Sequence, residues 1–399
     1  MTVEGHRVVA AEKACDLAKP WFLGQVGTPD GPLAWVDGQP GPFDVAVNRA
    51  VDIVRSAKAP LIYGLSHSST EAQRAATALA DALGANIDTT ASTGHAPSIL
   101  ALQQSGESTC TLGEVQQRAD LVIYWGSDPD QTHPRHRERY ASPRAGRKIF
   151  IVDDCESETI HGVEAFIPVT PGCHWEALAT LRQLVKGLEP RVPVENSLRM
   201  LAKEILACRF GIIFFGAGLT AGAMAHRVVE ELLKMVSELN DGRRFYARRM
   251  RRSGDVAGAD SVLAWQTGYP FGVDFSRGFP RYNPGEFTGP ERLARGEPDC
   301  CLFIGGATAK DFPPAAREHL SKIPVIVLDS PGEPLIVPAT VRFTTAIYGI
   351  HRHGTAYRMD EVPIPLRPIL PTNLPSDADV LNAILKAWRS STPGASPIA

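Results

Sequence analysis

The stretch APLIYGLSHSSTEAQRAATALADALG, residues 59–84, contains one complete strand and one complete helix, and it indicates the fold class. Its first part, Ala59–Ser66, is a short apolar run that is typical of a buried strand. Alanine and leucine then recur at helical spacing, with Ser69 or Thr70 as the N-cap and Gly84 as the stop. A buried strand followed directly by a helix is the building unit of a parallel sheet covered by helices.

Further apolar runs repeat this unit along the chain, and another short one precedes Thr89. They lie at residues 119–126, 147–154, 209–222, 299–307 and 323–330. Strands separated by helices of this length predict parallel sheets with helices on both faces. The number of strands favours two α/β units over a single sheet.

The composition is that of an ordinary globular protein. The chain has 399 residues, of which 44% are hydrophobic and 21% are charged, and this length is ample for two or three domains. The net charge of −3 gives no reason to expect nucleic acid. No apolar run reaches the length of about 18 residues that spans a membrane, and the N-terminus lacks the apolar core of a signal peptide. We therefore expect a cytoplasmic protein.

The cysteines agree with that location, because their number is odd, their spacing is irregular and no C-x-x-C pair occurs. They are Cys15, Cys110, Cys155, Cys173, Cys208, Cys300 and Cys301. This pattern predicts reduced thiols, most of them packed in cores, and not a self-contained zinc or iron–sulfur site.

Ligands of open α/β sheets bind beyond the carboxyl ends of the strands, and four loops of the chain have that position. One is the turn TTASTGHAPSILAL, which contains Gly94 and His95. Two others follow the strands at 119–126 and 147–154. The fourth contains Gly216 and Gly218, a G-x-G without the third glycine of a dinucleotide fingerprint. A tight strand-to-helix turn explains this pair as well as a nucleotide site does.

Two groups of basic residues are further candidates for binding. The loop after residues 119–126 carries His133, Arg135, His136, Arg137 and Arg139. This group is typical either of a phosphate site or of a solvated basic face for an acidic partner, and it lacks a third ligand for a metal. In the aromatic stretch 267–287, Arg277 and Arg281 either hold a carboxylate or belong to a loop made rigid by its prolines. The proline-rich tail after Pro363 is expected to be extended over a surface.

Several segments together resemble the B subunit of formylmethanofuran dehydrogenase, a molybdopterin oxidoreductase. They are LIYGLSHSSTEAQRAA, DTTASTGHAPS, ADLVIYWGSDPDQTHPRH, VLAWQTGYPFGVDFSRGFPRYNPGEF and GTAYRMDEVP. The resemblance runs from about Lys13 to Pro363. It implies two related open parallel-sheet α/β domains, with the iron–sulfur domain reduced. The implied boundaries are 1–45 plus 341–399 for the reduced first domain and tail, 46–108 plus 258–340 for one α/β domain, and 109–257 for the inserted one.

The family implies a bis-pterin tungsten or molybdenum centre that reduces carbon dioxide to formate, and a [4Fe–4S] cluster. This sequence departs from both patterns. Gly94 stands where the family has the metal-binding cysteine before His95, and glycine has no side chain to bind a metal. Cys15 matches the fourth cysteine of the cluster motif without the other three, and one thiolate cannot hold a cubane.

The loops that would hold the pterin also depart from the family pattern. Asp128 replaces the asparagine of the G-x-N-P turn, and after Asp154 the basic residue of the VD-x-R loop is replaced by Cys155. Glu156 and Glu158 add negative charge. Two acids beside a pyrophosphate in a partly buried pocket cost on the order of a few kcal/mol. We therefore expect no metal, cluster or pterin cofactor, with Gly94, His95, Arg277 and Arg281 as vestigial positions and Gly216 and Gly218 in a degenerate pterin loop.

The formyltransferase/hydrolase complex of one-carbon metabolism contains a redox-inactive relative of this subunit. That complex moves a formyl group from formyl-tetrahydromethanopterin to a methanofuran-type carrier and releases formate. The resemblance thus implies a non-catalytic structural subunit, with amidohydrolase-like hydrolase, formyltransferase and C-type subunits as partners. Two alternatives stay open: an active molybdenum or tungsten dehydrogenase subunit, and a binding module with a repurposed pterin pocket.

Overall fold

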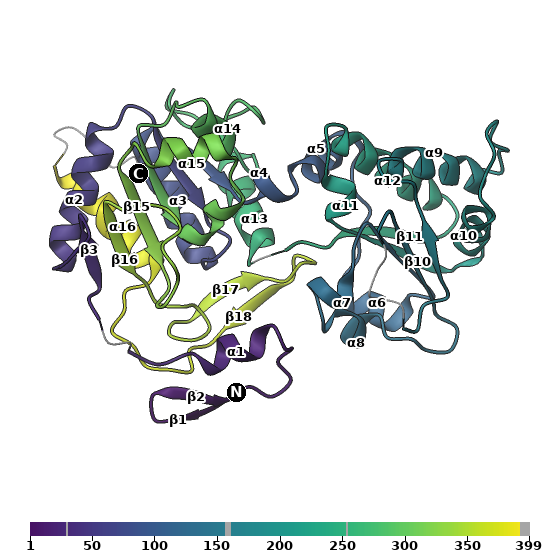
Figure 1. The fold of residues 1–399 in the computed structure, drawn as a ribbon, viewed down its shortest axis with the longest axis horizontal. Helices are drawn as coiled ribbons and strands as arrows, with labels where there is room; N and C mark the ends of the chain where they lie inside the picture. Colours follow the sequence, from purple (N-terminus) through teal and green to yellow (C-terminus); the bar gives the residue numbers. More distant parts are fainter. Residues whose placement is uncertain (29–30, 156–160, 253, 392–399) are drawn as a thin grey trace. The chain divides into compact units, whose positions relative to one another are not determined.

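The computed structural model describes residues 1–28, 31–155, 161–252 and 254–391. The chain forms two compact units (Figure 1). Met1–Thr93 and Ser253–Ala399 together make the discontinuous unit, and Gly94–Arg252 make the inserted unit. Each unit is built on its own sheet, as the number of apolar runs predicts.

The discontinuous unit contains a nine-stranded sheet in the order β13-β12-β6-β5-β14-β15-β16-β3-β4. In chain order the strands are β3 (Ala34–Val36), β4 (Gln39–Gly41), β5 (Pro60–Gly64), β6 (Asn86–Thr89), β12 (Val273–Asp274), β13 (Arg281–Tyr282), β14 (Cys300–Ile304), β15 (Val325–Asp329) and β16 (Val341–Thr344). The central strands from β6 to β16 are parallel, and the strands at both edges are antiparallel. The prediction of an open parallel sheet is therefore confirmed, with short antiparallel additions at its edges.

Helices cover both faces of this sheet. One apolar core lies between the sheet and the longer helices, which are α2 (Phe43–Ser56), α3 (Thr70–Leu83), α13 (Val256–Thr267) and α16 (Asp377–Ser390). A second core lies under α14 (Gly289–Ala294), the 3₁₀ turn η1 (Gly306–Asp311) and α15 (Pro314–Leu320). Helix α3 begins and ends as its sequence predicts: the Ser69 hydroxyl accepts a hydrogen bond from Ala72 N at 3.4 Å, and Gly84 ends the helix with φ 64°.

The inserted unit contains a five-stranded, fully parallel sheet in the order β11-β10-β7-β8-β9. Its strands are β7 (Leu121–Trp125), β8 (Lys148–Asp153), β9 (Ala165–Pro168), β10 (Phe210–Phe215) and β11 (Arg244–Arg249). Its helices are α5 (Ala96–Ser105), α6 (Leu112–Arg118), α7 (Pro129–Thr132), α8 (His136–Tyr140), α9 (His174–Val185), α10 (Asn196–Ala207), α11 (Ala217–Thr220) and α12 (Ala225–Leu239). The short helix α4 (Ala91–Gly94) leads into this unit.

Small elements complete the discontinuous unit. They are the hairpin of β1 (Thr2–Glu4) and β2 (Arg7–Ala10), helix α1 (Ala18–Leu23), and the hairpin of β17 (Gly354–Tyr357) and β18 (Pro363–Leu366). His351 connects the two ends of the chain, because its Nε2 lies 2.7 Å from the carbonyl oxygen of Val26 and its Nδ1 accepts a hydrogen bond from Ile347 N. Among the described residues, no helix is both long and apolar enough to cross a membrane.

The compact units differ from the predicted three-part division in two places. The inserted unit begins at Gly94 rather than 109, because α5 packs against α12. Strands β3, β4 and β16 belong to the nine-stranded sheet, although the sequence assigns their residues, wholly or largely, to a reduced first domain. The proline-rich stretch PIPLRPILPTNLP, residues 363–375, contains β18 and no helix, as expected for an extended segment. Beyond it, α16 packs against α2 and α3 through buried Val380, Leu381 and Ile384.

Candidate functional site

The turn with Gly94 and His95 joins α4 to α5. Gly94 is exposed, and a Cβ placed on it would meet no atom within 4 Å. His95 is buried, with 9% of its surface exposed, and its carbonyl oxygen accepts hydrogen bonds from the backbone and the hydroxyl of Ser98. The turn therefore has room for a side chain at position 94, and the sequence places none there.

The loop after β8 lies beside His174, which a hydrogen bond links to strand β7. Trp125 Nε1 donates to His174 Nδ1 at 3.2 Å, so the remaining proton of the neutral imidazole is on Nε2. That Nε2 lies 3.5 Å from Asp154 Oδ2. On its other oxygen, Asp154 accepts a hydrogen bond from the thiol of Cys155 at 3.3 Å. The acid of this predicted pterin loop is thus oriented by groups of the chain itself.

The same loop offers three possible donors for a metal ion, because ligand atoms of Asp153, Asp154 and Cys155 lie within 4.8 Å of one another. His174 does not extend this set, since its Nε2 carries the proton and has no lone pair to give. Burial raises the pKa of Asp153, whereas for Asp154 the Cys155 thiol and His174 outweigh burial and lower the pKa. A negative loop of this kind fits a pyrophosphate poorly. Glu156 and Glu158 lie outside the described residues.

The glycines after β10 pack against the turn that follows β7. A Cβ on Gly216 would lie 2.5 Å from the carbonyl oxygen of Gly126, and one on Gly218 would lie 2.8 Å from Gly126 Cα. The amide of Gly218 donates to that carbonyl oxygen at 3.0 Å. This close backbone contact accounts for both glycines without a bound nucleotide. Asp128 likewise has a local role, because its carboxylate caps α7 by accepting a hydrogen bond from Gln131 N at 3.3 Å.

The basic loop does not present its charges as one open face. Arg135 forms an ion pair with Glu138, and Arg137 is buried, with bonds to Asp130 and to the carbonyl oxygen of His161. His133 Nε2 lies 2.8 Å from the carbonyl oxygen of Arg251. Of the five predicted side chains only Arg139 belongs to an exposed residue. Most of these side chains bind groups of their own unit, so the loop offers neither a phosphate site nor a wide basic docking face.

His136 of this loop is a buried aromatic neighbour and not a solvated base. It is 5% exposed, lies edge-on to Phe214 at 4.6 Å, and has no hydrogen-bond partner on Nε2 among the described residues. Burial lowers the pKa of His136 to about 3, against about 6.5 for a histidine in the unfolded chain. Acid therefore protonates the unfolded chain first, and the stability present above pH ~6.5 is lost as the pH falls toward 3.

We expect His136 to account for a loss of about 2 kcal/mol in the free energy of unfolding between pH 7.5 and pH 5. Urea unfolding at both pH values measures this loss. His136→Phe should remove that part of the pH dependence, because phenylalanine keeps the ring and cannot be protonated. An unchanged pH dependence in the variant would contradict the assignment. His353→Gln is the control, because it removes a histidine that is exposed in the folded chain and should leave the pH dependence as it is.

The other predicted positions belong to the discontinuous unit. Arg281 is the first residue of β13, and its guanidinium binds the buried carboxylate of Asp274 on β12 and lies 4.8 Å from the ring centre of Phe287. Arg277 is exposed in the loop between these strands. Of the two interpretations of this stretch, a rigid loop describes Arg281 better, since its carboxylate partner is internal. Cys15 is a free, partly buried thiol just before α1.

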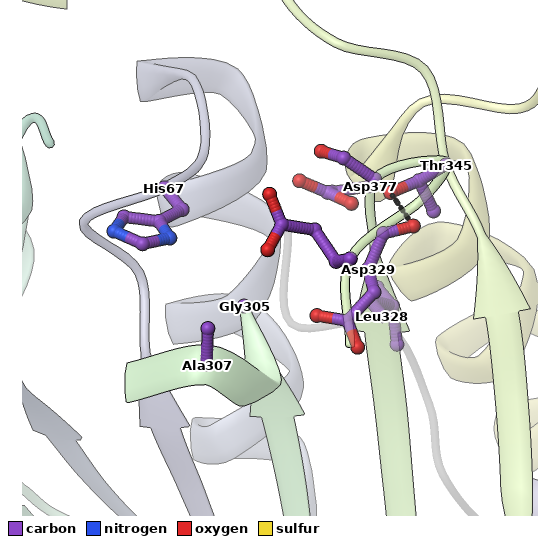
Figure 2. Close-up of a pocket in the computed structure, with 9 residues that line it drawn as sticks. His67, Gly305, Ala307, Leu328, Asp329, Thr345 and Asp377 are labelled. Carbon is purple, nitrogen blue, oxygen red and sulfur yellow. Dashed lines mark hydrogen bonds between the residues drawn. The ribbon is translucent and has the colours of Figure 1, made fainter. Parts of the chain in front are cut away.

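A site that was not predicted from the sequence lies at the carboxyl ends of β5, β14 and β15 (Figure 2). His67 faces Asp329 and Asp377 there across a small cavity, and Glu333 also lines it. Ligands of open α/β sheets bind beyond the carboxyl ends of the strands, and this cavity has that position, as the four loops named above do. The signal in the sequence was an acid directly after the apolar run of β15, together with a histidine in the loop after β5.

Comparison with known proteins decides the family. The B subunit of the tungsten-containing formylmethanofuran dehydrogenase 2 of Methanocaldococcus jannaschii is 36% identical over 406 residues, which cover 96% of this chain and 93% of that protein. The chain belongs to the family of formylmethanofuran dehydrogenase B subunits. The corresponding protein of Methanococcus maripaludis is 34% identical, over 96% of this chain and 94% of its own length. The predicted family resemblance is therefore confirmed.

The family also includes a relative outside these dehydrogenases. The B subunit of the formyltransferase/hydrolase complex of Methylorubrum extorquens is 27% identical over 69% of this chain and 75% of its own length. The crystal structure of that complex with methylofuran contains a chain that matches with a TM-score of 0.76 and 25% identity, over 90% of this chain and 99% of that one.

Acetylene hydratase of Pelobacter acetylenicus shares the fold, with a TM-score of 0.61 and 9% identity over 88% of this chain and 60% of its own. This likeness supports the predicted molybdopterin-oxidoreductase-like fold. No family model matches the chain.

Proposed function

We propose that this member of the family is a non-catalytic structural subunit of a formyltransferase/hydrolase complex. The complex would convert formyl-tetrahydromethanopterin to formate through a methanofuran-type carrier. The observation that carries the proposal is Gly94, which has no side chain at the position that corresponds to the family's metal-binding cysteine, although the turn has room for one.

The proposal includes the absence of a pterin, a tungsten or molybdenum ion and an iron–sulfur cluster from this chain. Three features of the inserted unit support it. The loop with Asp154 and Cys155 is acidic and internally bonded, Asp128 caps a helix, and the glycines of the β10 turn are covered by the backbone at Gly126. None of these groups is a free donor for a dianionic pyrophosphate, so these loops are unsuited to hold the cofactor that a redox step requires.

The partners in this proposal are a hydrolase, a formyltransferase and a C-type subunit of the same complex. The support is the likeness over 90% of the chain to a subunit in the crystal structure of such a complex. The odd number and irregular spacing of the seven cysteines are typical of a reducing compartment and support a cytoplasmic location. Copurification of the tagged chain from its source, followed by mass spectrometry, tests the partners.

One observation favours a second function, an active tungsten- or molybdenum-dependent dehydrogenase subunit. Identity to the tungsten-containing relative from M. jannaschii is 36% over nearly the whole chain, whereas identity to the formyltransferase/hydrolase relative is 27% over 69% of it. Identity over a whole chain follows descent, and a single ligand position decides metal binding. Gly94 therefore favours the structural role, although the identity to the dehydrogenase subunit is higher.

Metal analysis of the purified native complex separates the two functions. We expect tungsten and molybdenum well below one ion per chain, and no fluorescent pterin after oxidative release. One tungsten or molybdenum ion per chain would contradict the structural role and support an active dehydrogenase subunit. Gly94→Cys is a useful companion variant, because its Cβ meets no atom within 4 Å; a folded variant still without metal is expected, since the pterin loops remain unsuited.

A further inference from the structure

Two adjoining cavities occur within the discontinuous unit, and His67, Ser330 and Glu333 line both of them. The smaller cavity, of about 30 Å³, also contacts Asp329 and Asp377. The larger, of about 540 Å³, has a mainly apolar wall, to which Trp21, Phe22, Ile347 and Ile350 belong. Through these shared residues an acidic cavity adjoins an apolar one, and every residue that lines them belongs to the same unit.

The acidic cavity contains a buried acceptor that the chain does not use. Asp329 is 3% exposed; its Oδ1 accepts a hydrogen bond from Gly306 N at 2.7 Å, and its Oδ2 has no hydrogen-bond partner within the described part of the chain. Asp377 accepts a hydrogen bond from the Ser68 hydroxyl, and the Thr345 hydroxyl donates to the backbone carbonyl oxygen of Asp329. A buried oxygen without a donor is unfavourable, so a ligand that supplies an N–H there completes a missing hydrogen bond.

The charges around this cavity are mostly negative. Asp329, Glu333 and Asp377 are three carboxyl groups, and burial lowers the pKa of His67, which keeps that ring neutral near pH 7. Arg342 is the nearby counter-charge; its guanidinium donates to the carbonyl oxygen of Glu333 at 2.8 Å and lies 5.5 Å from the centre of the Trp35 ring. The positive charge of Lys310 also lowers the pKa of His67. Burial raises the pKa of Asp329 and of Asp377, and a positive group beside them would favour their charged forms.

A ligand with a positive end and an apolar body matches both cavities. The volume of the larger cavity lies within the range of about 300–1,000 Å³ that small-molecule sites have. We propose that the adjoining cavities bind an organic ammonium ion, whose nitrogen is held by Asp329 and Glu333 and whose apolar part lies against Trp21, Phe22 and Ile347. This proposal does not depend on whether the subunit is catalytic.

Two other ligand classes fit less well. A bare metal ion needs converging donors, and in the described chain only Asp153, Asp154 and Cys155, in the inserted unit, bring three such atoms within 4.8 Å of one another. An anion such as a phosphate would meet the carboxylates of Asp329 and Glu333 at close range, and like charges in a buried pocket repel strongly. The carboxylates therefore select for positive charge.

Three probes with the same ring and different charge test the proposal on the full chain. Benzylamine carries one positive charge at pH 7, benzyl alcohol none, and benzoate one negative charge. Titration calorimetry is expected to give at least ten-fold tighter binding of benzylamine than of benzyl alcohol, and no binding of benzoate. Equal binding of all three, or of none, would overturn the proposal.

Charge-removing variants place the binding at the acidic cavity. Asp329→Asn keeps an oxygen that accepts from Gly306 N, and Glu333→Gln is at a partly exposed residue, so at least the second should fold. Each is expected to weaken benzylamine at least ten-fold, whereas Glu318→Gln, an exposed acid paired with Lys322, should change nothing. Unaltered affinity in both variants contradicts the proposal. So does tighter binding of guanosine monophosphate in competition with benzylamine, because that result would assign the cavity to a nucleotide.

Discussion

Replacing Arg147 by methionine is expected to lower the free energy of unfolding by about 3 kcal/mol or more. Arg147 is 8% exposed and stands directly before β8. Its guanidinium donates to the carbonyl oxygens of Val115 at 2.7 Å, Gln116 at 2.9 Å, Ala119 at 2.9 Å and Ser142 at 3.0 Å. Methionine keeps much of the volume and removes all four of these hydrogen bonds from a charged donor.

The position of these acceptors explains why a buried cation is stable here without a carboxylate. Val115 and Gln116 lie near the C-terminal end of α6, where the carbonyl groups carry the negative end of the helix dipole. Burial lowers the pKa of Arg147 to about 10, so the guanidinium is still charged at pH 7. The charge thus caps the helix and links it to the start of β8.

Arg144→Met is the matched control for this variant. Arg144 is exposed and donates to Gln117 and Ala119 at 3.1 and 3.4 Å, so its loss should cost less than about 1 kcal/mol. Urea unfolding followed by circular dichroism measures both variants. An equal decrease in the free energy of unfolding in both variants would contradict the argument, because the buried guanidinium of Arg147 would then contribute no more than the exposed one of Arg144.

Gly64→Ala is the second substitution with a large expected effect, about 4 kcal/mol on the free energy of unfolding. Gly64 ends β5 with φ 115°, and a Cβ there would lie 2.3 Å from the carbonyl oxygen of Ile304 on the neighbouring strand β14. The clash is with backbone, so no side-chain rotation relieves it. The two central strands would have to separate at the end where the acidic cavity lies.

Gly84→Ala is the control that separates the cost of the steric clash from the cost of a positive φ. Gly84 also has a positive φ, 64°, and belongs to the same unit, but its Cβ would lie an ordinary 3.6 Å from the nearest atom. The left-handed conformation alone should cost about 1 kcal/mol. Thermal and urea unfolding of both variants give the comparison, and a loss at Gly64 no larger than at Gly84 would refute the steric argument.

The predicted strands were found where an apolar run is fully buried on both faces. All residues of β5, β7, β10, β14 and β15 are buried, and continuous apolar runs mark such strands in the sequence. Strand β11 was missed because its sequence, RFYARR, is rich in charge. Arg249 is nevertheless buried, because Glu107 pairs with it at 2.7 Å, and residues 107 and 249 are far apart in the sequence.

For the candidate loops, the sequence indicates their positions in the fold but not their hydrogen-bond partners. The turn at Gly94, the loop at Asp154 and the glycines after β10 all lie at strand ends, as the sequence indicates. Their hydrogen-bond partners could not be predicted, because His174 and Gly126 come from other segments. The acidic cavity was missed for the same reason, because His67, Asp329 and Asp377 are isolated in the sequence. The parallel order of β5, β14 and β15 brings the first two together, and the packing of α16 on α2 and α3 adds Asp377.

The insertion of one unit into the other determines the order in which the chain can fold on the ribosome. Ile62 of β5 pairs with Leu302 of β14, about 240 residues later. At a synthesis rate of ~5–20 residues per second, β5 waits roughly 10–50 s with one edge open. The inserted unit is complete during that wait and can fold first. A nascent chain released before β14 is made would expose an unpaired central strand, so protection by a chaperone during synthesis matters most in that interval.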